Sequence, residues 1–89
     1  MSKNEQIQNR RRAAVTTELA IAAFLRAQIG HDFEVTAASN IQRGSFISLC
    51  ATAEALDAAR PWMEAAGKVF TDRDVDPEDP GATIDFYRL

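Results

Sequence analysis

The chain has 89 residues, of which 46% are hydrophobic and 26% charged, and its formal net charge is −3. This length predicts one domain over residues 1–89, with the first six residues frayed, and excludes two domains; the ordinary composition excludes disorder throughout. The longest apolar run is shorter than the roughly 20 residues that cross a bilayer, so no membrane partner is expected.

The first predicted element is a long helix from about Asn4 to Ile29. Alanine and leucine have high helix propensities, no proline interrupts the segment, and Gly30 follows where a left-handed C-cap residue is expected. The apolar stripe expected to face the core consists of Val15, Leu19, Ala22 and Ile29, with Ile21, Phe24 and Leu25 partly round its side.

This helix is longer and more apolar than one sheet requires. At 1.5 Å per residue it measures roughly 39 Å, whereas a strand of seven or eight residues reaches roughly 25 Å, so its first turns must project beyond the sheet. Between Val15 and Ile29 only Glu18 and Arg26 are charged, which is few for a helix with one face in water. The sequence therefore predicts that something besides the sheet covers this helix.

Four strands and a second helix are predicted after Gly30. Alternation of apolar and polar residues predicts strands over Phe33–Ala38, Ser45–Ala51, Lys68–Val75 and Ala82–Leu89. The segment Ala53–Ala66 has helical spacing, with Thr52 as its N-cap and a kink, or a break into two short helices, at Pro61.

The order helix, strand, strand, helix, strand, strand predicts an α+β fold. The second and third strands are joined by a helix of crossover length, so parallel placement is expected for this pair if they share a sheet. We therefore predict a two-layer sandwich with a mixed four-stranded sheet and both helices on one face.

Charge is distributed unevenly along the chain. Residues 1–30 contain five basic and two acidic residues, a balance of +3, whereas residues 69–89 contain six acidic and two basic residues, a balance of −4. The basic cluster is Arg10, Arg11 and Arg12. Successive helical side chains splay around the surface, and no interleaved aromatic residues accompany them, so a solvated helix end is favoured over nucleic-acid binding.

An acidic segment near the C-terminus is a second candidate surface. Its carboxylates are Asp72, Asp74, Asp76, Glu78 and Asp79. A calcium loop would need glycine and glutamate where this chain has Pro77 and Thr83, so no metal site is predicted. The simple interpretation is a solvated strand and turn; the alternative is that these carboxylates imitate nucleic-acid phosphates and bind a basic site on a partner.

No catalytic site and no cofactor are predicted. His31, the only histidine, has no nucleophile motif near it and is expected to be a loop or capping residue. Cys50, the only cysteine, cannot form an internal disulfide and is interpreted as structural. Trp62 has two interpretations, of which a core position is favoured over a binding residue.

The leading hypothesis is a non-enzymatic protein-interaction module. A cytoplasmic location is expected because the N-terminal residues lack the pattern of a signal peptide. The module would form a homodimer or bind another protein through its first helix, with Phe24 and Trp62 among the contact residues. A sharper version is an inhibitor or accessory subunit of a nucleic-acid-processing assembly, of the kind that mobile elements encode. The alternative is nucleic-acid binding through the arginines at positions 10–12.

Overall fold

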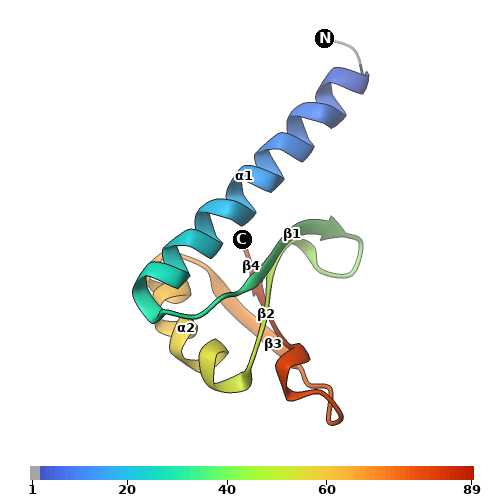
Figure 1. Cartoon of the computed structure of the whole chain (residues 1–89). Helices are drawn as coiled ribbons and strands as arrows, with labels where there is room; N and C mark the ends of the chain where they lie inside the picture. The colour runs from blue at the N-terminus through green and yellow to red at the C-terminus, as the bar shows by residue number, and fades with distance from the viewer. Residues whose placement is uncertain (1–2) are drawn as a thin grey trace.

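The structure, a computed structural model, describes the backbone of residues 3–89 and the side chains of residues 16–89. Figure 1 shows a long helix beside a β-sheet and a shorter helix. The elements are α1 (Lys3–Ile29), β1 (Glu34–Asn40), β2 (Gly44–Ala51), α2 (Ala53–Ala65), β3 (Val69–Asp74), the 3₁₀ turn η1 (Pro80–Ala82) and β4 (Thr83–Arg88). The predicted α+β class and element order are confirmed.

The strand order in the sheet is β1-β2-β4-β3, and all three neighbouring pairs are antiparallel. The predicted mixed sheet is therefore wrong. Strands β2 and β3, which α2 connects, do run in the same direction, but β4 lies between them and pairs antiparallel with both. This split β-α-β arrangement replaces one parallel contact with two antiparallel ones, which are slightly more stable per residue.

The helix ends follow the predicted signals. Gly30 has a φ of 77° and donates its amide to the carbonyl of Arg26 at 2.8 Å, so it ends α1 in the left-handed region as expected. The Thr52 hydroxyl accepts from the amide of Ala55 at 3.2 Å and caps α2.

Helix α2 is continuous through Pro61, so the predicted alternative of two short helices is wrong. Its buried residues, Ala55, Leu56, Ala59 and Met63, lie on both sides of the proline along the chain. Their burial holds both halves against the rest of the molecule, which offsets the hydrogen bond that the proline removes. A kink at Pro61 stays a prediction.

The buried stripe of α1 differs from the predicted one. Leu25 has no exposed surface, whereas Leu19 is 67% exposed. The side chain of Glu18 accepts from the backbone amide of Ala37 on the edge strand β1 at 2.9 Å. Ile21 and Ala22, three and four positions after Glu18, share its side of the helix and are half-buried, whereas Leu19 faces away from the sheet.

The core lies against one face of the sheet. Along the central strands β2 and β4, the buried residues pair directly with one another: Ile47 with Tyr87, Leu49 with Asp85, and Ala51 with Thr83. The same buried cluster includes Leu25 of α1 and the apolar face of α2. The alternate residues, including Phe46 and Phe86, are only half-buried and form the other face of the sheet.

The first half of α1 extends well beyond the sheet (Figure 1). The molecule measures 44 × 28 × 23 Å, and its radius of gyration of 13.8 Å exceeds the roughly 12 Å expected for a compact chain of this length. The predicted overhang is therefore present.

Two leucines of α1 test the corrected stripe. We expect Leu25→Ala to lower the free energy of unfolding by about 2–5 kcal/mol, because it leaves a cavity in the core. Leu19→Ala removes the same atoms from an exposed site and should change stability by less than about 0.5 kcal/mol. Urea denaturation of both variants measures the difference, and equal losses would contradict the orientation of α1.

Candidate interaction surface

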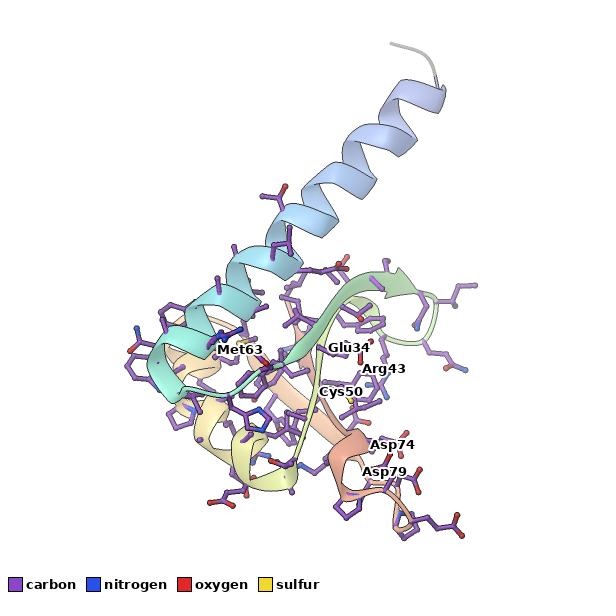
Figure 2. The ribbon with its side chains drawn as sticks, viewed as in Figure 1. Glu34, Arg43, Cys50, Met63, Asp74 and Asp79 are labelled. Atoms are coloured by element: carbon purple, nitrogen blue, oxygen red, sulfur yellow. The ribbon has the colours of Figure 1, made fainter. Side chains whose placement is uncertain are left out.

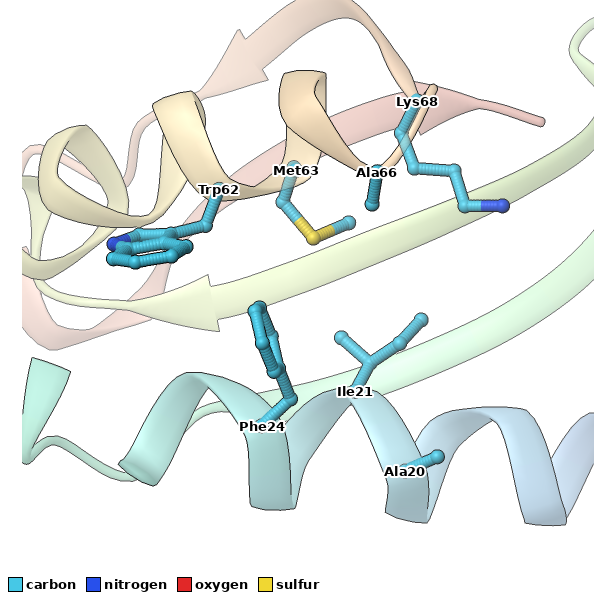
Figure 3. A pocket seen from close by; sticks show the side chains of 7 residues that line it. All are labelled: Ala20, Ile21, Phe24, Trp62, Met63, Ala66 and Lys68. Atoms are coloured by element: carbon cyan, nitrogen blue, oxygen red, sulfur yellow. The ribbon is translucent and has the colours of Figure 1, made fainter. Parts of the chain in front are cut away.

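An apolar groove runs between α1 and α2 and has a volume of about 250 Å³ (Figure 3). Its lining residues are Ala20, Ile21, Phe24, Trp62, Met63, Ala66 and Lys68. Lys68 is the only charged side chain among them. We call this surface the interhelical groove.

Phe24 and Trp62 form the most exposed aromatic part of the interhelical groove. Their rings meet edge to face, with centroids 5.8 Å apart, and the two residues are 43% and 41% exposed. Trp62 is therefore not a core residue, and the favoured sequence interpretation is wrong. The next residue, Met63, takes the buried position, because a step of one residue rotates the side chain by about 100° around a helix.

The arginine cluster lies in the extended half of α1. The backbone of Arg10, Arg11 and Arg12 is helical, but their side chains lie outside the described residues. Their contribution to a binding surface remains a prediction from the sequence.

The predicted acidic residues do not form one surface of free carboxylates. Asp72 pairs with Arg43 through two hydrogen bonds, of 2.6 and 2.9 Å, and this pairing lowers the pKa of Asp72 to about 2. Asp74 is exposed at the end of β3. These two residues face solvent on the half-buried side of the sheet, because they pair with Phe86 and Ile84 of β4.

The remaining acidic residues, Asp76, Glu78 and Asp79, lie in the segment between β3 and β4, where Figure 2 labels Asp79. Asp76 accepts from the amide of Glu78 at 2.9 Å, and Asp79 accepts from the amide of Gly81 at 3.1 Å. These bonds are local turn and capping interactions. Across the residues with described side chains, no group of three His, Cys, Asp or Glu residues is arranged to hold a metal ion.

A buried polar cluster, which the sequence analysis did not identify, joins α2 to the sheet. Asp85 of β4 has no exposed surface, and the guanidinium group of Arg73 on β3 donates to it at 2.6 and 3.1 Å. Arg73 also donates to Asp57 of α2 at 2.6 Å. These contacts raise the pKa of Arg73, chiefly through the hydrogen bonds to Asp85.

Arg60 of α2 completes this polar cluster. Its guanidinium group lies 3.6 Å from Asp85 and stacks 3.7 Å from the ring centroid of Phe70. A buried carboxylate is costly unless it is paired, so the two arginines explain why Asp85 can occupy a core position. In the sequence, Asp85 is an aspartate in a strand of alternating polarity. That pattern is equally typical of an exposed residue, so it did not predict the burial of Asp85.

Cys50 and His31 show no arrangement for catalysis. Cys50 is half-buried, and burial, followed by the charges of Glu34 and Asp79, raises the pKa of its thiol, so the reactive thiolate is disfavoured. His31 is exposed in the loop after α1, and its ring nitrogen lies 2.6 Å from the carbonyl oxygen of Asp32. This position agrees with the predicted loop role.

Comparison with known protein families, curated proteins and solved structures finds no match to this chain. Within the described part of the chain, no helix is both long and apolar enough to cross a membrane.

Tyr87, the only tyrosine in the chain, provides a test of the buried cluster. Burial, and then the charge of Asp85, raises the pKa of its hydroxyl from 10.0 to about 12. Because the folded state keeps the proton more tightly than the unfolded state, stability should be unchanged below pH 10 and fall as the pH rises toward about 12.

Spectrophotometric titration of the tyrosinate absorbance measures this pKa directly. We expect a midpoint near 12 in the folded protein and near 10 after denaturation in urea. Tyr87→Phe should remove this alkaline loss of stability, because it removes the group that titrates. A midpoint near 10 in the folded protein would contradict the burial of this group.

Proposed function

We propose that this chain is a non-enzymatic protein-interaction module that forms a homodimer through the interhelical groove and α1. Part of this proposal is that both helices lie over the core face of the sheet, in two layers. The observation that carries the proposal is the exposed pair of Phe24 and Trp62 at an apolar groove.

The composition of the groove supports protein binding. Exposed aromatic residues beside a hollow are the usual anchors of protein interfaces, where tryptophan and tyrosine are enriched. The groove is lined by one lysine and otherwise by apolar or aromatic side chains, so it offers few polar groups to orient a substrate.

The extended half of α1 supports an assembly. This half stands away from the sheet (Figure 1). Short helical segments without tertiary contacts are only marginally stable in water, up to about 12–15 residues. Packing against another chain would supply the tertiary contacts that such a helix needs.

The charge distribution supports a second copy of this chain as the occupant. The balance is +3 over residues 1–30 and −4 over residues 69–89. In a two-fold dimer each copy presents both surfaces, so the basic helix of one copy can approach the acidic end of the other. A neutral or uniformly charged chain would lack this complementarity.

Analytical ultracentrifugation over a range of micromolar concentrations tests the proposal. We expect a dimer whose dissociation constant rises at least about tenfold in Phe24→Ala and in Trp62→Ala, because each change removes a central aromatic contact. Ile41→Ala is the control, since Ile41 lies in the turn between β1 and β2, is fully exposed, and belongs neither to α1 nor to the groove. Higher ionic strength should weaken the dimer.

A protein that stays monomeric at all concentrations would overturn the homodimer. A dimer that is weakened by Leu19→Ala but not by the two aromatic substitutions would place the interface elsewhere on α1. Inhibition of a nucleic-acid-processing assembly, and nucleic-acid binding through the arginines at positions 10–12, stay predictions of the sequence.

A further inference from the structure

The half-buried face of the sheet carries a second surface, distinct from the interhelical groove. The strand pairing arranges this face in three cross-strand rows: Ala38, Phe46, Arg88 and Val69; then Thr36, Ser48, Phe86 and Asp72; then Glu34, Cys50, Ile84 and Asp74. The first two rows contain the aromatic and basic residues, and the third contains two carboxylates.

Two aromatic rings lie next to each other on the central strands of this face. Phe46 of β2 pairs with Arg88 of β4, so Phe46 and Phe86 are diagonal neighbours, and their ring centroids are 5.9 Å apart. Because Phe46 and Phe86 lie far apart in the sequence, their contact could not be predicted from local patterns. Their position on adjacent strands creates an aromatic surface on this face of the sheet.

The guanidinium group of Arg43 extends this planar surface. It lies 3.7 Å from the centroid of the Phe86 ring, and its two bonds to Asp72 fix its orientation. The hydroxyl of Thr71 also donates to Asp72, at 2.8 Å. Asp72 therefore acts as a positioning residue that holds the arginine over the ring.

A hollow of about 240 Å³ adjoins these planar groups, and it is lined by Gln42, Arg43, Phe46, Thr71 and Arg88. This volume is slightly below the roughly 300–1,000 Å³ of sites for drug-sized ligands, so it suits a single ring system. The lining combines flat groups for stacking, an amide and a hydroxyl for hydrogen bonds, and the exposed cation Arg88.

We propose that this hollow binds a base of a single-stranded nucleic acid. The base stacks on the Phe46 ring and the Arg43 guanidinium plane, both of which are standard stacking surfaces for unpaired bases. Gln42 faces the base edge as a donor and acceptor, and Arg88 contacts the adjoining phosphate.

The acidic third row sets the extent of the site. Glu34 and Asp74 would repel phosphates at that end of the sheet, so the bound strand crosses only the first two rows and does not extend over the third. A short strand of a few nucleotides should therefore bind nearly as well as a long one. This site shares no lining residue with the interhelical groove.

Fluorescence anisotropy with labelled oligouridine and oligothymidine, and with a duplex of the same length, tests the proposal. We expect both single strands to bind and the duplex to bind at least about tenfold more weakly, because its bases are already stacked. Unlabelled uridine monophosphate as competitor separates the recognition of one nucleotide from that of a strand.

Phe46 provides a pair of matched variants. Phe46→Leu keeps an apolar side chain but loses the aromatic plane and should weaken binding about tenfold, whereas Phe46→Tyr should retain the affinity.

Arg88→Gln should lower the slope of log K against log salt by about 0.7, the value for one phosphate contact on a single strand. Lys68→Gln removes a cation from the interhelical groove and should leave binding unchanged. Circular dichroism and thermal denaturation check that each variant folds.

Absence of binding to either single strand, or equal affinity in Phe46→Leu and Phe46→Tyr, would overturn the proposal. Equal or tighter binding of the duplex would also overturn the proposal. If Phe46→Leu changes the dimer dissociation constant and no oligonucleotide binds, the proposal is overturned and this face is a protein interface.

Discussion

Strand β4 sets the two faces on which the rest of the molecule depends. It forms hydrogen bonds to β2 along one edge and to β3 along the other, and its side chains must alternate between the two sides of the sheet. Thr83, Asp85 and Tyr87 are consequently buried, while Ile84 and Phe86 lie on the half-buried face. One six-residue strand thus supplies polar groups to the core and an aromatic ring to the opposite surface.

The polar residues in the core constrain how α2 can pack. Asp85 is buried between two guanidinium groups, one from β3 and one from α2, and the removal of either cation would leave a buried charge incompletely paired. Arg73 also reaches Asp57 on α2, so this helix is held by directional contacts as well as by the burial of Leu56, Ala59 and Met63. The orientation of α2 in turn places Trp62 beside Phe24.

Local patterns in the sequence predicted the helices and strands, but they could not predict which of these elements contact one another. Gly30 and Thr52 indicated helix ends because caps depend on neighbouring residues. The position of β4 between β2 and β3 depends on long-range pairing, and the expectation of a mixed sheet failed there. The burial of Leu25 rather than Leu19 likewise depends on how α1 packs against residues that are distant in the sequence, in the core cluster of the sheet and α2.

The two outer strands have a further consequence for self-association. On β1, the carboxylate of Glu18 already occupies the outward-facing amide of Ala37, and on β3 the regular register is interrupted between Phe70 and Asp72. An additional strand would meet an occupied hydrogen-bond donor at the β1 edge and an irregular, acidic edge at β3. Such edges disfavour amyloid-like growth. These two edges thereby hinder copies of this chain from associating by extension of the sheet.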